Sequence, residues 1–254
     1  MVHSLFGDGV QFFNVAHRGF SQTAPENTLS SFEYAIQAGA NMLEMDVMLT
    51  GDGQAVVFHD YKLGRTTNGS GLVSRLPASH IRSLDAGLWF DESFRGERVP
   101  LLEEVLEMAE GRVLLDIEIK HRRKDDLDVL VEKCIRAVER HRMSDDVLFT
   151  SFNLEALRLL HYSNPRLRFA PLYRHNLKPT PRSFPVRYGA QAVVVNHLFL
   201  NRTAVRNLHE LGLKVFVYTV NGRRRILRMM EMGVDGIISD NPAVVRAVAG
   251  KARC

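Results

Sequence analysis

Cysteine is scarce in this chain, with two residues among 254. Cys134 lies in a helical pattern and Cys254 ends the sequence, and neither has a Cys or His partner at zinc-binding spacing. This usage excludes a disulfide framework and a cysteine-based structural zinc site. It is typical of proteins from a reducing compartment, so we expect a cytoplasmic location.

Long apolar stretches are also missing. No run approaches the roughly 20 residues that a membrane-spanning helix needs. The first residues, Met1–Gly9, lack the basic and apolar regions of a secretory signal. We therefore expect no stable membrane insertion.

Charge of one sign is in only slight excess, with 33 Lys and Arg against 29 Asp and Glu. The basic runs Arg122–Lys124 and Arg223–Arg225 are short and lack the interleaved aromatic residues of a base-stacking surface. We interpret them as solvated helix faces and expect no nucleic-acid partner. Apolar residues make up 45% and charged residues 24%, which is ordinary for a globular protein and argues against disorder.

The sequence does have a regular alternation of strand and helix patterns. Eight apolar runs predict strands that crossovers can join: Phe13–His17, Asn41–Thr50, Arg112–Lys120, Val147–Phe152, Arg168–Tyr173, Gln191–Asn196, Lys214–Asn221 and Gly236–Ser239. Amphipathic patterns lie between nearly all of them: Thr28–Ala38, Leu101–Ala109, Leu127–His141, Leu154–Tyr162, Arg202–Leu211 and Arg223–Met232. This order predicts an α/β fold, a closed TIM (β/α)8 barrel that forms one catalytic domain over residues 1–254. Its active site is expected where the strands end.

A ninth apolar run, Ala55–His59, follows Thr50 too closely for a parallel crossover. We expect it to form an antiparallel hairpin strand after the second barrel strand. The dipeptide Asp52-Gly53 favours a type I′ turn, which would pair Gly51 with Gln54.

In that register His59 faces Asp46, and Glu44 is a diagonal neighbour on the same face. A shift of one residue would move His59 to the other face. Because apolar residues flank the two acids within Met42–Leu49, we expect both carboxylates to point into the barrel. Inward carboxylates repel unless they are protonated or bridged by a cation, and oxygen ligands suit Mg²⁺ or Ca²⁺.

The third barrel strand repeats this alternation. Its apolar face is expected to pack against helices, which leaves Asp116, Glu118 and Lys120 inside the barrel. Glu118 lies late in the strand and is predicted to be a third metal ligand. For Asp116 two interpretations stay open: an interior ion pair with Lys120, or a catalytic role.

The first strand ends on His17-Arg18-Gly19. The planar guanidinium of Arg18 suits two phosphate oxygens, and Lys120 could add a further positive charge. Two imidazoles, His17 and His59, beside an anion and a divalent metal would form a general acid–base pair. These residue types favour phosphodiester cleavage.

The ordered set of motifs resembles the glycerophosphodiester phosphodiesterase family from about His17 to Pro242. The motifs are His17-Arg18-Gly19, Pro25-Glu26-Asn27-Thr28, Glu44-Met45-Asp46, His59-Asp60, Glu118-Ile119-Lys120, Thr219-Val220-Asn221 and Gly233–Pro242. The resemblance implies a TIM-barrel hydrolase that releases glycerol 3-phosphate from glycerophosphodiesters.

In that family pattern His17 and His59 are the catalytic acid and base, and Arg18 and Lys120 hold the phosphate. The resemblance also implies one bound Ca²⁺ or Mg²⁺ with three ligands, Glu44, Asp46 and Glu118. The free glycerol hydroxyl would attack phosphorus and expel the alcohol, and water would then open the cyclic phosphate. Which histidine acts first stays open.

Two further features belong to the resemblance. Residues 61–100 match a small insertion of the family, and we expect a capping subdomain over the barrel mouth because so long an unstructured loop is unusual. Where the family usually has Trp, this chain has Tyr218, which we expect to form an aromatic wall of the alcohol pocket. The expected core of the cap is Leu72, Leu76, Ile81, Leu84, Leu88 and Trp89.

Two other functions stay open. One is lysophospholipase D-type cleavage of lysophospholipids, which would need an apolar surface around the mouth. The other is a catalytically inactive barrel that binds phosphorylated ligands, which is disfavoured because both histidines and all three acids are present. The expected partner is a small-molecule substrate, and a homodimer stays open.

Overall fold

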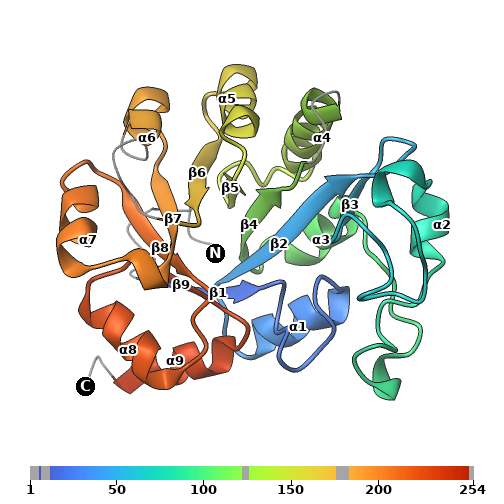
Figure 1. The fold of residues 1–254 in the computed structure, drawn as a ribbon, viewed down its shortest axis with the longest axis horizontal. Coiled ribbons are helices and arrows are strands. Elements are labelled where there is room, and N and C mark those ends of the chain that lie inside the picture. Colours follow the sequence, from blue (N-terminus) through green and yellow to red (C-terminus); the bar gives the residue numbers. More distant parts are fainter. Residues whose placement is uncertain (1–5, 7–11, 122–125, 176–182, 252–254) are drawn as a thin grey trace.

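A closed barrel of parallel strands forms the centre of the molecule (Figure 1). The computed structural model describes residues 6, 12–121, 126–175 and 183–251. The sheet has the order β1-β9-β8-β7-β6-β5-β4-β2-β3 and closes through pairing of β1 with β2, which confirms the predicted TIM barrel. The strands are β1 Phe13–His17, β2 Met42–Leu49, β3 Ala55–Val57, β4 Leu114–Ile119, β5 Val147–Ser151, β6 Arg168–Tyr173, β7 Ala192–Asn196, β8 Lys214–Tyr218 and β9 Gly236–Ser239.

Helices surround the barrel in Figure 1. Several begin at an asparagine whose side chain accepts from a backbone amide of the first turn, as Asn153 and Asn201 do. Within the described ranges, no helix is long and apolar enough to cross a bilayer. The helices are α1 Leu29–Gln37, α2 Ala78–Arg82, α3 Leu102–Ala109, α4 Leu127–Arg140, α5 Leu154–Ser163, α6 Ser183–Tyr188, α7 Arg202–His209, α8 Arg223–Glu231 and α9 Pro242–Lys251, with 3₁₀ turns η1 Val73–Arg75, η2 Glu92–Phe94 and η5 His197–Phe199.

Some of the basic and cysteine residues considered in the sequence analysis lie within the described part of the chain, and others do not. Arg223–Arg225 lie exposed at the start of α8, as expected for a solvated helix face, and Cys134 is buried in α4. The run Arg122–Lys124, Cys254 and most of Met1–Gly9 lie outside the described residues.

Strand alternation separates two apolar layers. On β4 the outward-facing Leu115 and Ile117 are fully buried against helices, whereas Leu114 points inward with Phe13 and Phe216. Burial of each such side chain contributes about 1.5–3 kcal/mol. The inward apolar residues fill the barrel toward the amino-terminal ends of the strands, so the charged inward residues lie at the carboxyl-terminal ends.

The hairpin differs from the prediction by one residue. Val47 pairs with Val57, and the amide of Thr50 donates to the carbonyl of Gln54 at 2.9 Å. The loop therefore has three residues, and its last one, Gly53, has a φ of +73°. This is a type I turn followed by a left-handed glycine, so the predicted type I′ turn and the pairing of Gly51 with Gln54 are wrong.

Side-chain bonds explain the longer loop. The hydroxyl of Thr50 accepts from the amide of Gln54 at 2.9 Å, and Asp52 accepts from the amide of Ala78 at 3.0 Å. These bonds favour a turn in which Asp52 keeps an ordinary backbone conformation. Asp46 consequently lies opposite Phe58, whose amide donates to its carbonyl at 2.8 Å, so the predicted pairing of His59 with Asp46 is wrong.

Residues 61–100 contain a small apolar cluster. Ile81 is fully buried in it and Leu76 and Leu84 pack against it, as predicted. Leu88 and Trp89 are 36% and 40% exposed, so their assignment to this core is wrong. Their exposure follows from Asp85, because the carboxylate accepts from the amides of residues 87, 88 and 96 and turns the backbone around itself. Leu72 is half-buried outside the cluster.

Candidate active site

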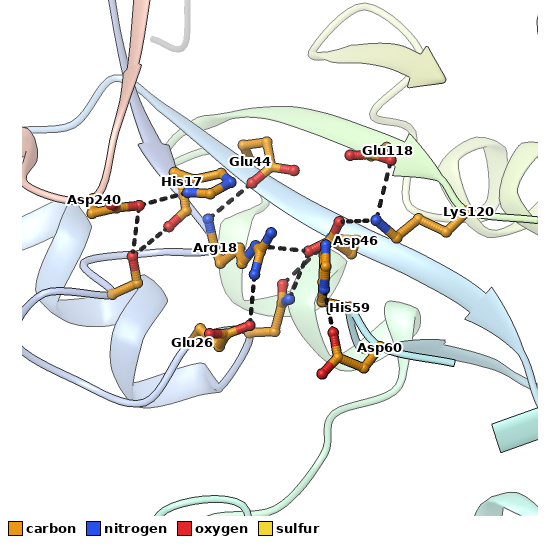
Figure 2. Close-up of polar contacts among 12 residues, drawn as sticks. His17, Arg18, Glu26, Glu44, Asp46, His59, Asp60, Glu118, Lys120 and Asp240 are labelled. Carbon is orange, nitrogen blue, oxygen red and sulfur yellow. Dashed lines mark hydrogen bonds and ion pairs between the residues drawn. The ribbon is translucent and has the colours of Figure 1, made fainter. Parts of the chain in front are cut away.

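Strand register brings the predicted site residues to one end of the barrel (Figure 2). His17 at the end of β1 pairs in register with Glu44 on β2. Farther along β2, Asp46 pairs in register with Glu118 on β4. Because inward positions alternate along each strand, residues from three separate segments share one layer of the barrel interior.

A cavity of about 370 Å³ opens at this end. Its lining combines charged residues from the β1–β4 side with a mixture of aromatic, apolar and polar residues from the β5–β8 side. The charged group is His17, Arg18, Glu44, His59, Asp116, Glu118 and Lys120, and the second group is Thr150, Phe152, Leu172, Arg174, His175, Asn196, Phe199, Tyr218 and Thr219. Asp46 does not line the cavity and is 1% exposed.

Three carboxylates form a compact cluster. One oxygen each of Glu44, Asp46 and Glu118 lies within 4.8 Å of the others. Burial and the neighbouring carboxylates raise the pKa of Glu44 well above its usual value, and burial with the charge of Asp46 raises the pKa of Glu118 to about 7. A buried set of mutually repelling oxygen donors fits Mg²⁺ or Ca²⁺.

Asp46 has its own cationic partners. Its carboxylate lies 3.1 Å from Nε of Arg18 and 3.3 Å from Nζ of Lys120, and it accepts from Nδ2 of Asn27 at 2.9 Å. Burial would raise the pKa of Asp46, but these two cations outweigh it and hold the pKa below its usual value. Asp46 therefore remains ionised while Glu44 and Glu118 are held closer to neutrality.

Asp116 has a different environment. Its carboxylate accepts from the hydroxyl of Thr150 at 2.6 Å, and burial raises its pKa to about 8. Lys120 forms its ion pairs with Asp46 and with Glu118, the latter at 3.4 Å. The interpretation of Asp116 as the ion-pair partner of Lys120 is therefore wrong.

Each histidine has a carboxylate at its Nδ1 atom. Nδ1 of His17 lies 2.5 Å from Asp240, which directly follows β9. Asp240 also accepts from Nδ2 of Asn221 at 2.6 Å and from the hydroxyl of Ser21 at 3.3 Å. Burial would raise the pKa of Asp240, but its bonds to His17 and Asn221 lower it. These contacts fix the orientation of the His17 ring.

His59 reaches the cavity although the hairpin register differs from the prediction, because it lies beyond the end of β3. Its Nδ1 lies 2.5 Å from Asp60. Burial lowers the pKa of His59, and the positive charges of Arg18 and Lys120 lower it further. The neutral imidazole is thus favoured at neutral pH.

Arg65 links the two sides of this charged region. Its Nε contacts Asp60 at 2.5 Å, and its terminal nitrogens contact Glu26 at 2.7 and 2.8 Å. Glu26 in turn accepts from NH1 of Arg18 at 2.8 Å. A continuous ion-pair chain therefore runs from His59 through the inserted segment to Arg18, and we call it the Arg65 bridge.

Sequence reasoning gave no role to the carboxylates that contact the histidines, to Arg65 or to Asn27, the hydrogen-bond donor to Asp46. Asp60 directly follows His59, which is a local signal. Asp240 follows the last strand, and the last strand of a closed barrel lies beside the first, which is a topological signal. Nothing in the sequence indicates that Arg65 connects Asp60 with Glu26. Asn27 is part of the motif Pro25-Glu26-Asn27-Thr28, but the motif alone does not indicate its bond to Asp46.

Tyr218 contributes an aromatic ring to the cavity lining. Its ring packs edge-to-face against Phe152 at 6.1 Å between centroids. Its hydroxyl donates to the carbonyl of Tyr173 at 3.0 Å, and burial raises the pKa of Tyr218 to about 12. The hydroxyl is therefore neutral and already bonded within the protein.

Comparison with known proteins identifies related sequences along almost the whole chain. The model of the glycerophosphoryl diester phosphodiesterase family matches residues 17–244. A glycerophosphodiester phosphodiesterase of Caldanaerobacter subterraneus subsp. tengcongensis is 38% identical over 234 residues, which is 90% of this chain and 93% of that protein. A putative glycerophosphodiester phosphodiesterase of Bacillus subtilis is 36% identical over 231 residues, which is 90% of this chain and 94% of that protein.

Solved structures agree with the sequence relatives. An Oleispira antarctica phosphodiesterase in complex with the product sn-glycerol-3-phosphate superposes with a TM-score of 0.89 at 30% identity, covering 93% of this chain and 96% of that one. A glycerophosphodiester phosphodiesterase from Agrobacterium tumefaciens gives a TM-score of 0.80 at 32% identity, covering 92% and 98%. The chain is therefore an enzyme and belongs to the glycerophosphoryl diester phosphodiesterase family.

Proposed function

We propose that this enzyme hydrolyses glycerophosphodiesters to glycerol 3-phosphate and an alcohol, with His17 and His59 as the acid–base pair. The observation that carries the proposal is the shared cavity: both imidazoles line it, and both are held at Nδ1 by a carboxylate. The product complex of the Oleispira antarctica relative supports the same product here.

Glu44, Asp46 and Glu118 would hold one divalent cation, Ca²⁺ or Mg²⁺. When bound, the cation supplies positive charge that polarises a phosphoryl oxygen. Arg18 and Lys120 line the same cavity and would bind the other phosphate oxygens. Because the side chains of Arg18 and Lys120 also contact Asp46, their positions are fixed before substrate arrives.

The proton transfers follow from the fixed rings. With Nδ1 engaged by a carboxylate, Nε2 is the ring atom that exchanges a proton with substrate. One histidine removes the proton of the glycerol hydroxyl as its oxygen attacks phosphorus, and the other protonates the departing alcohol. The cyclic phosphate is then opened by water with the two roles reversed.

The departing alcohol would lie against Phe152, Leu172 and Tyr218. This apolar wall also favours a second candidate function, lysophospholipase D-type cleavage, because an acyl chain needs such a surface. A barrel that only binds phosphorylated ligands would have no use for two carboxylate-oriented imidazoles beside an acid cluster. Capping by residues 61–100, a cytoplasmic location and a homodimer stay predictions.

Release of glycerol 3-phosphate from glycerophosphocholine, measured with a coupled dehydrogenase, tests the proposal. Activity should disappear in His17→Ala and in EDTA, and added Mg²⁺ or Ca²⁺ should restore the EDTA-treated enzyme. A substrate that lacks the adjacent glycerol hydroxyl should be cleaved poorly, because no cyclic phosphate can form. Full turnover of metal-free enzyme, or equal cleavage of both substrates, would contradict the metal dependence or the cyclic route respectively.

A further inference from the structure

An apolar pair is exposed beside the mouth of the cavity. Leu198 and Phe199 lie on the 3₁₀ turn η5 and are 64% and 40% exposed. The turn is fixed by His197, whose Nδ1 contacts the carbonyl of Tyr218 and whose Nε2 contacts Arg225, both at 3.0 Å. Large apolar side chains are thus presented to solvent by an ordered turn.

A cationic surface adjoins this pair. The side chains of Arg223, Arg224 and Arg228 on α8 are exposed, and they line a hollow of about 790 Å³ together with Leu198. In the part of the chain that the structure describes, no carboxylate pairs with any of these three arginines. Exposed arginines elsewhere commonly do have such a partner, as in the pair of Arg136 with Glu132.

Acidic residues are almost excluded from this region of the chain. From residue 196 to residue 231 the only acids are Glu210, at the carboxyl end of α7, and Glu231, the last residue of α8, and neither forms an ion pair with Arg223, Arg224 or Arg228. Positive charge on this surface is therefore not balanced locally, although the whole chain carries a net charge of only +4.

The surface is continuous with the catalytic cavity. Phe199 lines the cavity, Leu198 lines the arginine hollow, and Thr219 lines both. The turn η5 follows β7 and the start of α8 follows β8, so both belong to the carboxyl-terminal face of the barrel, where the cavity opens. A flat partner on this surface would therefore meet the mouth of the active site.

We propose that Leu198, Phe199 and the arginines of α8 dock the enzyme on an anionic phospholipid surface. Exposed apolar side chains that enter the headgroup region, next to arginines that meet lipid phosphates, are the combination that peripheral membrane proteins use. A nucleic acid fits less well, because a base-stacking surface uses several aromatic side chains, whereas the exposed pair offers one, Phe199, beside aliphatic Leu198. The docked orientation would place the cavity at the lipid headgroups.

Vesicle cosedimentation tests this docking. The enzyme should sediment with vesicles of phosphatidylcholine and phosphatidylglycerol but not with phosphatidylcholine alone, and high salt should weaken binding. The combined Arg223→Gln, Arg224→Gln and Arg228→Gln variant should lose about a hundredfold in partitioning, because each arginine near an anionic surface contributes about fivefold. Leu198→Ser should cost a smaller factor that persists at high salt.

Matched controls carry the same changes at other sites. Arg98→Gln, Arg136→Gln and Arg166→Gln remove the same charge, and Leu211→Ser removes a side chain that is 44% exposed at the end of α7. Both control variants should bind vesicles as the unmodified enzyme does. All variants should hydrolyse soluble glycerophosphocholine normally, which separates this proposal from the proposed function.

Three results would overturn the docking surface. One is equal vesicle binding by the α8 variant and its control, and another is absence of binding to anionic vesicles altogether. The third is tighter binding of the unmodified enzyme to a DNA duplex than to anionic vesicles, with Leu198→Ser unchanged in both. That last outcome would assign the surface to a soluble polyanion.

Discussion

The two sides of the cavity differ in how their charges are held. On the side of β1–β4, Asp46 has three polar partners, and the Arg65 bridge joins both histidine-bearing segments. On the side of β5–β8, aromatic and apolar side chains are mixed with polar ones such as Arg174 and Asn196, and among the described residues Arg174 and the arginines of α8 have no carboxylate ion-pair partner. In Figure 1 the inserted segment with α2 and the helix α7 lie at opposite edges of the molecule.

This contrast separates two requirements of the proposed reaction. Proton transfer and cation binding need atoms fixed to within a fraction of an ångström, and interlocked ion pairs provide that order. The leaving alcohol needs only shape and an apolar contact surface. Substitutions on the β1–β4 side should therefore reduce activity far more than substitutions on the β5–β8 side.

The largest effect is expected from the acid cluster. Glu44→Gln should reduce affinity for Mg²⁺ or Ca²⁺ by more than about a hundredfold, because it removes a charged donor from the cluster. The fold should persist, since the amide oxygen of Gln can still accept from the amide of Arg18, as Glu44 does at 2.9 Å. Titration calorimetry measures the affinity.

Asp116→Asn is the matched control, because Asp116 lies in the same layer but outside the cluster of converging oxygens. Its metal affinity should fall much less. Equal losses in the two variants would mean that the ligand set is misassigned.

The next largest effect concerns the Arg65 bridge. Arg65→Ala should lower kcat by about tenfold, because Asp60 and Glu26 lose their shared partner and His59 loses its fixed orientation. Removal of a nearby cation should also raise the pKa of His59, so the limb of the pH–rate profile that reports His59 should move to higher pH. Steady-state kinetics across pH measure both changes.

Arg65→Lys should recover part of kcat, since it keeps the charge but not the planar set of donors. Arg95→Ala is the control within the inserted segment, where Arg95 pairs with Glu92 on the surface. A fall in kcat without any movement of the pH profile would show that Arg65 orients the site residues but does not influence the pKa of His59.

The fold was accessible from the sequence because its signals are local. Each barrel strand has an apolar run of its own, and the inward and outward faces of β4 follow directly from alternation. The hairpin register was not accessible, because two turn types suit Asp52-Gly53. The side-chain bonds of Thr50 and Asp52, the latter to Ala78, decide between them.

The residues of the candidate site also fall into those that the sequence could predict and those that it could not. His17, Glu44 and Glu118 could be placed because each occupies an inward or terminal position of a strand. The contacts that orient them join distant residues, such as His17 with Asp240, 223 positions apart. A single sequence carries no distance information of that kind, so Asp240 and Arg65 appear only when the barrel is closed.

A smaller effect is expected for the stability of the metal-free enzyme. In the unfolded chain Asp116 has an ordinary pKa near 4, whereas burial raises it to about 8 in the fold. Between these pH values the folded state binds the extra proton, so stability falls as pH rises. Asp116→Asn removes the free-energy cost of the raised pKa and should stabilise the protein at pH 8 by about 2 kcal/mol. This gain is smaller than the full pKa shift implies, because the amide of Asn must still be buried.

Thermal unfolding in EDTA at pH 5 and pH 8 measures this difference. The gain in Tm of Asp116→Asn over the unmodified protein should be larger at pH 8. The amide oxygen of Asn can still accept from Thr150, so the fold should be retained. An equal gain at both pH values would show that the carboxyl of Asp116 does not titrate in this range.

The smallest effect is expected on the β5–β8 side, for Tyr218→Phe. The hydroxyl is bonded to the carbonyl of Tyr173, so its removal should cost about 1 kcal/mol of stability. The ring that faces Phe152 is retained, so kcat should be unchanged and KM should stay within about twofold. A fall in kcat/KM of tenfold or more would mean that the hydroxyl contacts the substrate in the transition state. In that case a side chain of the β5–β8 side would be positioned on the reacting atoms as closely as those of the β1–β4 side, and the division between the two sides of the cavity would not hold.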